Sequence, residues 1–198
     1  MPRIGLLGGS FDPPHRAHLA LAEIALQTLA LSSVHWLVAA APWQKAGRVV
    51  ASAEQRLAMV ALLLEGRPAM QADARELQRA GQTFTIDSVL ELRAQAPNAE
   101  LFLIIGQDQY ARFDTWVRHE ELLRNVTLAV AARAGQAPCA PPSLPPHRMH
   151  TLPLPDWPIS STLVRERAAQ GVDLAPWVGP AVAHYISQQR LYRAISRS

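Results

Sequence analysis

Apolar runs of strand length alternate along the chain with segments whose apolar residues recur every three or four positions. The runs lie at 4–7, 34–41, 101–105 and 126–132, with a weaker one at 69–72. Unbroken runs of this kind are typical of parallel strands that are buried on both faces. Their alternation with helices predicts an α/β fold: a Rossmann-like, doubly wound and mostly parallel sheet with helices on both faces.

Start and stop signals mark the helices between these runs. Ser52 and Gln55 form a capping box for a helix that runs to residue 64, before Gly66. Thr85 is a suitable cap for a helix over 86–94. The other predicted elements are a first helix that presents Leu19, Ala22, Leu26 and Leu29 on one face, helices at 120–123, 159–171 and 180–191, and an edge strand at 149–152.

The chain shows no internal repeat and no sign of a second domain. We therefore expect residues 1–198 to form one domain, with a C-terminal helical portion at about 159–192 packed on it. Residues 134–148 hold five of the sixteen prolines and little that could pack. This segment predicts a surface loop, long enough to suggest flexibility.

Composition narrows the class of protein. Hydrophobic residues make up 49% of the chain and charged residues 18%, which excludes general disorder. The net charge of +3 comes from basic residues that are scattered, so a small phosphate-bearing ligand is favoured over nucleic acid. The longest apolar run, 57–64, is too short to cross a membrane, and Cys139 is the single cysteine. We therefore expect a cytoplasmic protein, with its oligomeric state left open.

The turn after the first strand carries the clearest chemistry. Gly8 and Gly9 supply backbone freedom, and Asp12 is positioned before two prolines to cap the helix that follows. His15 and His18 stand three residues apart on the opening turn, so both imidazoles project from one face. The first N–H groups of a helix have no helical acceptor, and the combination predicts an anion site with two titratable donors.

Other polar segments also follow predicted strands. Lys45 follows the second strand, Asp108 the fourth, and the segment from Ser160 to Arg165 comes after the last. Doubly wound sheets bind ligands beyond the carboxyl ends of their strands, where the strand order reverses. We therefore expect these segments and the histidine turn to meet in one crevice.

Three motifs resemble those of a known family. They are GGSFDPPHRAHL at 8–19, GQDQYARFDTW at 106–116 and ISSTLVR at 159–165, and they look like the signatures of the nucleotidyltransferases that adenylate nicotinate mononucleotide. TFTID at 83–87 and YISQQRLY at 185–192 are also similar to that family. One departure is Ala17, which stands where the family usually has glycine between the two histidines.

The resemblance implies a reaction and a set of ATP-binding residues. ATP and nicotinate mononucleotide would give nicotinate adenine dinucleotide and pyrophosphate, a step of NAD biosynthesis, by in-line attack without a covalent intermediate and with Mg²⁺. His18 would donate to the α-phosphate with His15 beside it, and Arg165 would complete the catalytic set. The remaining residues implied for ATP binding are Gly8, Gly9, Ser10, Phe11, Ser161 and Thr162.

The resemblance also implies how the second substrate is bound. Trp116 would stack on the pyridine ring, while Thr85 and the N–H of Val117 would bind its carboxylate. Gly106 would also bind the substrate, Asp108 would accept a hydrogen bond from a ribose hydroxyl, and Lys45 would reach a phosphate. Whether the acid or the amide form of the mononucleotide is preferred stays open.

Several alternatives compete with this interpretation. A pair of histidines can hold a metal, but no third ligand stands at a suitable spacing, so no metal site is predicted. The crevice could belong to a nucleotide-binding module without catalysis, or to an adenylyltransferase acting on nicotinamide mononucleotide or phosphopantetheine. A nucleic-acid-binding protein would need a clustered basic stripe or stacking aromatics, which the sequence lacks.

Overall fold

A computed structural model describes residues 1–40, 50–79, 81–133, 137–155 and 157–193 of the 198-residue chain. Its centre is a six-stranded sheet with the order β3-β2-β1-β4-β5-β6, in which every neighbouring pair is parallel. The α/β doubly wound fold is therefore confirmed. The strands are β1 (Arg3–Gly9), β2 (Ser33–Val38), β3 (Met70–Asp73), β4 (Glu100–Gly106), β5 (Thr127–Arg133) and β6 (Met149–Leu154).

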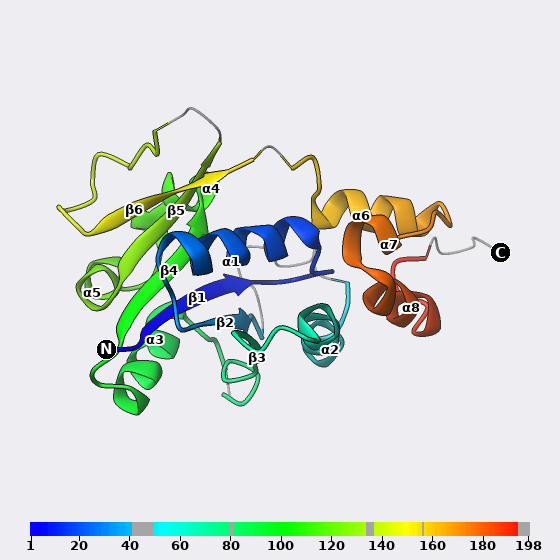
Figure 1. The fold of residues 1–198 in the computed structure, drawn as a ribbon, viewed down its shortest axis with the longest axis horizontal. Helices are drawn as coiled ribbons and strands as arrows, with labels where there is room; N and C mark the ends of the chain where they lie inside the picture. Colours follow the sequence, from blue (N-terminus) through cyan, green and yellow to red (C-terminus); the bar gives the residue numbers. More distant parts are fainter. Residues whose placement is uncertain (41–49, 80, 134–136, 156, 194–198) are drawn as a thin grey trace.

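Helices cover both faces of the sheet, and α6 to α8 gather at the end of the molecule to which β1 points (Figure 1). The helical elements are α1 (Arg16–Thr28), α2 (Ala53–Leu64), α3 (Thr85–Gln95), α4 (Gln107–Tyr110), the 3₁₀ turn η2 (Phe113–Thr115), α5 (His119–Asn125), α6 (Ser161–Ala169), α7 (Ala175–Val178) and α8 (Pro180–Gln188). Within the described residues, no helix has the length and apolar character needed to cross a membrane.

Alternation along the strands divides the core into two layers. Trp36 of β2 and Ile104 of β4 point to the side of α1, α2 and the C-terminal helices. Leu37 and Leu103, their neighbours in sequence, point to the side of α3 and α5. Successive side chains of a strand face opposite sides, so unbroken apolar runs are what a sheet covered on both faces requires.

Two predicted helix caps are wrong. Asp12 does not cap α1, because the chain continues through the two prolines and His15 becomes the N-cap residue. Thr85 is the first residue of α3, and Phe84 occupies the cap position. The capping box of α2 is confirmed: the Gln55 N–H lies 3.2 Å from Ser52 Oγ, and the Ser52 N–H lies 2.9 Å from Gln55 Oε1.

The order of the strands reverses between β1 and β4, which are neighbours at the middle of the sheet. The chain leaves β1 toward α1 on one side, and α3, which precedes β4, lies on the other. A crevice at the carboxyl ends of two such strands is where doubly wound folds bind ligands. The turn after β1 and the segment after β4 are thus at the expected position.

Candidate active site

The turn after β1 is closely packed around Phe11. A Cβ atom on Gly9 would lie 2.9 Å from the Phe11 ring, so only glycine fits there without movement. Phe11 itself has φ of 49°, in the left-handed region, and its side chain is 2% exposed. The ring contacts His18 edge-on, with 5.2 Å between centroids. The buried Phe11 ring therefore packs against His18 and forms part of the core beneath the turn.

The two histidines lie together at the start of α1. Their rings stack with centroids 3.6 Å apart, and His15 is buried whereas His18 is partly exposed. The backbone N–H of His15 donates to Nδ1 of His18 over 3.2 Å. Because Nδ1 accepts this hydrogen bond, neutral His18 carries its proton on Nε2. The outer nitrogen of His18 is therefore fixed as a hydrogen-bond donor.

Asp12 joins distant parts of the chain to this turn. Its side chain is 1% exposed and accepts hydrogen bonds from the N–H groups of Val50 and Ala51, at 2.9 and 3.1 Å. The hydroxyl of Tyr192 donates to the same carboxylate over 2.7 Å, from 180 residues further along the chain. Burial beside this carboxylate raises the pKa of Tyr192 far above its usual range. Asp12 was predicted as a local cap because no local pattern reveals partners so far away.

Arg56 is a buried cation beneath the same turn. Its guanidinium, from α2, donates to three backbone carbonyls: Ser10 at 2.7 Å, Ala51 at 3.3 Å and Ala40 at 3.2 Å. Burial lowers its pKa, and the nearby Asp12 carboxylate acts in the opposite direction. Arg56 was not among the residues predicted for the site. Its position three residues before Met59, on the buried stripe of α2, is the signal that could have found it.

The ISSTLVR segment docks directly on the histidine turn. Ser160 caps α6 by accepting from the Leu163 N–H at 3.1 Å. Ser161 Oγ donates to the Pro13 carbonyl at 2.9 Å. Arg165 donates to the Asp12 carbonyl at 2.8 Å, and its side chain is 23% exposed. Residues 148 and 153 positions apart in sequence are thus in contact, as the predicted crevice requires.

The first turn of α6 adds backbone donors to this arrangement. Among the described residues, no acceptor binds the N–H groups of Ser161 and Thr162. The Thr162 hydroxyl accepts from Arg165 at 3.3 Å, which holds the guanidinium beside these N–H groups. A helix N-terminus with an adjacent arginine suits the oxygens of an anion such as a phosphate.

The segment after β4 carries the residues predicted for the pyridine substrate. Gly106 caps α4, and Asp108 lies exposed on its first turn. Trp116 is partly buried, and one face of its indole stacks on Phe113 with centroids 5.0 Å apart. A ligand can therefore stack only on the opposite face of the indole. Val117 is 39% exposed.

An ion pair brings this segment to the start of α3, where Thr85 lies partly exposed. Arg118, just after Val117, places Nη1 3.1 Å from Oδ1 of Asp87 in the first turn of α3. Arg118 has φ of 54°, so a left-handed residue turns the chain into α5 at this point. Thr85 and Val117 thus belong to two neighbouring segments.

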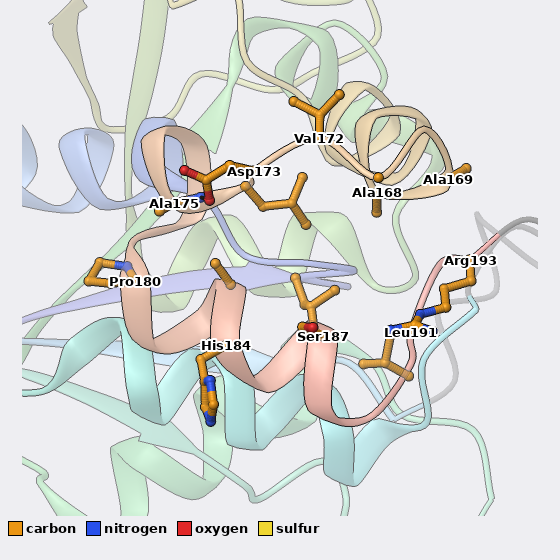
Figure 2. Close-up of a pocket in the computed structure, with 14 residues that line it drawn as sticks. Ala168, Ala169, Val172, Asp173, Ala175, Pro180, His184, Ser187, Leu191 and Arg193 are labelled. Atoms are coloured by element: carbon orange, nitrogen blue, oxygen red, sulfur yellow. Dashed lines mark hydrogen bonds between the residues drawn. The ribbon is translucent and has the colours of Figure 1, made fainter.

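Lys45 lies outside the described residues, so its predicted role stays a prediction. A cavity of about 800 Å³ is found elsewhere, between α6, α7 and α8, with Asp173, His184 and Arg193 on its wall (Figure 2). None of the predicted site residues lines that cavity. Within the described part of the chain, no group of three or more metal-binding side chains is present.

Known proteins that are similar to this chain point to one family. The model of a family described as cytidylyltransferase-like matches residues 6–167. A protein of Methylibium petroleiphilum, named a probable nicotinate-nucleotide adenylyltransferase, is 45% identical over 196 residues, which span 96% of this chain and 92% of that protein. A protein of the same name from Bordetella petrii is 45% identical over 200 residues, spanning 98% of this chain and 100% of that one.

A solved structure extends the comparison to the fold. Nicotinic acid mononucleotide adenylyltransferase from Plasmodium falciparum, complexed with NaAD, aligns with a TM-score of 0.77 over 97% of this chain and 98% of that one. At 18% identity this likeness concerns the fold alone. The sequence relatives identify the family more narrowly. The chain belongs to the cytidylyltransferase-like family and, within it, to the nicotinate-nucleotide adenylyltransferases.

Proposed function

We propose that this enzyme transfers the adenylyl group of ATP to nicotinate mononucleotide, forming nicotinate adenine dinucleotide and pyrophosphate for NAD biosynthesis. The 5′-phosphate of the mononucleotide attacks the α-phosphorus in line and pyrophosphate leaves, so no covalent enzyme intermediate forms. The docking of Ser161 and Arg165 on the turn that carries His15 and His18 is the observation that supports this proposal most strongly.

On the ATP side, the residues supply charge and orientation. A mononucleotide phosphate is already largely ionised at pH 7, so no general base is needed. The Nε2–H of His18 donates to a non-bridging oxygen of the α-phosphate, where negative charge increases in the transition state. His15 stacks on His18 and holds its ring in place. The catalytic contribution is therefore positioning together with electrostatic stabilisation.

The β- and γ-phosphates lie, in this proposal, between the histidine turn and the start of α6. Gly8, Gly9 and Ser10 offer backbone close to the triphosphate, while Arg165 and the N–H groups of Ser161 and Thr162 bind its outer oxygens. Arg165 and these N–H groups would share the phosphate charge with Mg²⁺ bound to ATP, which would supply further charge neutralisation. The same donors then hold pyrophosphate as it leaves.

On the other side of the crevice, we propose that Trp116 binds the pyridine ring of the mononucleotide. The ring stacks on the indole face that Phe113 leaves uncovered. Thr85 and the N–H of Val117 bind the carboxylate, next to the N-terminus of α3. Asp108 accepts a ribose hydroxyl, and Lys45 contacts a phosphate. The acid form is favoured over the amide because a helix N-terminus stabilises negative charge.

Pyrophosphate release tests the proposal. The purified protein is mixed with MgATP and, in separate reactions, with nicotinate mononucleotide, nicotinamide mononucleotide or phosphopantetheine. We expect the fastest release with nicotinate mononucleotide. Release only with phosphopantetheine would assign a different acceptor. Binding of both nucleotides without any release would identify a non-catalytic module.

A further inference from the structure

Glu76 is a buried carboxylate in the connection between β3 and α3. It is 6% exposed, and both oxygens accept hydrogen bonds from hydroxyl groups. Oε2 accepts from Thr83 Oγ1 at 3.0 Å, and Oε1 accepts from Ser88 Oγ at 3.2 Å. Thr83 is the first residue of the predicted motif over 83–87, and Ser88 follows its last residue, so one carboxylate binds at both ends of the motif.

The surroundings of Glu76 fix the direction of these hydrogen bonds. Ser88 Oγ also accepts from Arg79 Nη1 at 3.0 Å, so its single proton is directed to Glu76. Among the described residues, Glu76 has no oppositely charged group within 4.0 Å, because Arg79 pairs with Glu91 and Arg75 with Asp73. Burial raises the pKa of Glu76, and the hydroxyls of Thr83 and Ser88 act against that increase. The more distant charge of Arg79 also lowers this pKa, and that of Asp73 raises it. A buried carboxylate without a charged partner is costly, which indicates that it has a positional role.

The two hydroxyls belong to different parts of the α3 entry. Thr83 precedes the helix, whereas Ser88 lies inside its second turn, and Phe84 between them is the N-cap residue. Holding both to one rigid carboxylate sets the angle at which the chain enters the helix. That angle decides where the Thr85 hydroxyl and the first N–H groups of α3 point.

We propose that Glu76 is a positioning residue of the mononucleotide site, which through Thr83 and Ser88 holds Thr85 and the N-terminus of α3 in the orientation that binds the pyridine carboxylate. The inference rests on the proposed function, in which Thr85 contacts that carboxylate. Glu76 does not touch the substrate. Its effect is on the affinity for one substrate and leaves the chemical step unchanged.

The sharpest test uses the isosteric change Thr83→Val, which removes the hydroxyl and keeps the volume, with Thr83→Ser as the matched variant that keeps the hydroxyl. We expect Thr83→Val to raise the KM for nicotinate mononucleotide about 10-fold, with kcat and the KM for ATP changed less than about 2-fold. Thr83→Ser should restore the wild-type KM. Glu76→Gln should give a smaller increase than Glu76→Ala, because the amide oxygen keeps one acceptor.

Asp73→Asn is the control for a purely structural effect. Asp73 is buried in the same region, but it binds His35 and Arg75 and neither of the two hydroxyls. We expect this variant to lose stability without the selective rise in KM. Equal rises for both substrates, or the same split in Asp73→Asn, would overturn the proposal.

A binding measurement distinguishes failure of the inference about Glu76 from failure of the proposed reaction. Calorimetric titration with nicotinate mononucleotide, without ATP, should show the same roughly 10-fold loss in Thr83→Val. If wild type bound the mononucleotide but released no pyrophosphate, the proposed reaction would fail, and a roughly 10-fold weaker binding to Thr83→Val would still support the inference about Glu76. If Thr83→Val bound it as tightly as wild type, the inference would fail whatever the reaction.

Discussion

Two buried polar clusters support the two sides of the crevice, and they are built differently. The first cluster, Asp12, Arg56 and Tyr192, lies under the histidine turn and connects residues up to 180 positions apart. The second cluster, Glu76, Thr83 and Ser88, lies beside α3 and connects residues at most 12 positions apart. The support of the ATP side therefore forms only when the whole chain is folded, whereas the hydrogen bonds that support the start of α3 are local in sequence.

The clusters also differ in how charge is compensated. Arg56 and Asp12 are buried near each other, and backbone groups satisfy most of their hydrogen bonds. Glu76 is satisfied by hydroxyls alone. Backbone partners cannot be removed by mutation, so the first cluster is tested by replacing the side chain of Asp12 or Arg56, which breaks several hydrogen bonds at once. In the second cluster, the hydroxyl of Thr83 or Ser88 can be removed alone, which breaks a single hydrogen bond to Glu76.

The largest effect is expected for Arg56→Ala. It leaves three carbonyls without their donor and removes a buried positive charge near Asp12, whose other cationic neighbour is Arg165 at 3.9 Å, so the free energy of unfolding should fall by about 3–5 kcal/mol. Urea denaturation measures this change. Arg124→Ala removes only a surface ion pair with Glu120 and serves as the control. A loss no greater than in that control would refute the idea that the ATP side depends on a long-range cluster.

His18→Ala tests the chemical step on the ATP side of the crevice, whereas Arg56→Ala tests its stability. We expect turnover to fall at least about 100-fold with a modest change in ATP affinity, since the Nε2–H bond strengthens as charge develops on the α-phosphate. Steady-state kinetics measure the turnover, and titration with ATP measures the affinity. Near-normal turnover would remove His18 from the mechanism.

Trp116→Ala tests the mononucleotide side alone. Loss of the stacking surface should weaken binding of nicotinate mononucleotide by roughly 1–3 kcal/mol, with a smaller effect on ATP. Calorimetry with each nucleotide measures the difference. Equal losses for both would mean that the two sides are not independent, which would break the comparison.

The smallest effect concerns the pH dependence of stability. Burial raises the pKa of Glu76 above its ordinary value of 4.5. Between the unfolded and folded pKa the native state holds more protons, so Glu76 favours folding below pH 4.5 and this contribution is lost as pH rises through the folded pKa. Unfolding curves of wild type and Glu76→Gln should therefore diverge as pH rises from 4 to 7, with wild type losing stability relative to the variant. Parallel curves would contradict a buried, ionising Glu76.

Local pattern predicted the fold well. The apolar runs predicted five of the six strands, and the separately predicted edge strand at 149–152 forms the start of β6. The runs are clearest in the central strands, because a strand buried on both faces needs apolar residues at successive positions. The capping box of α2 was also correct, because its partners are three residues apart. The short helix α7 was missed, because its four residues are too few for periodicity to appear.

The chain order of motifs likewise determined that the histidine turn and the ISSTLVR helix would meet, since parallel strands bring their carboxyl ends to one edge. Tertiary structure alone decided the partners of Asp12, the burial of Arg56 and the hydrogen bonds between Glu76 and the start of α3. Spacing within a segment encodes contacts over one or two turns. Hydrogen bonds between residues tens of positions apart depend on how the packed layers bring segments together, and only the folded chain specifies that.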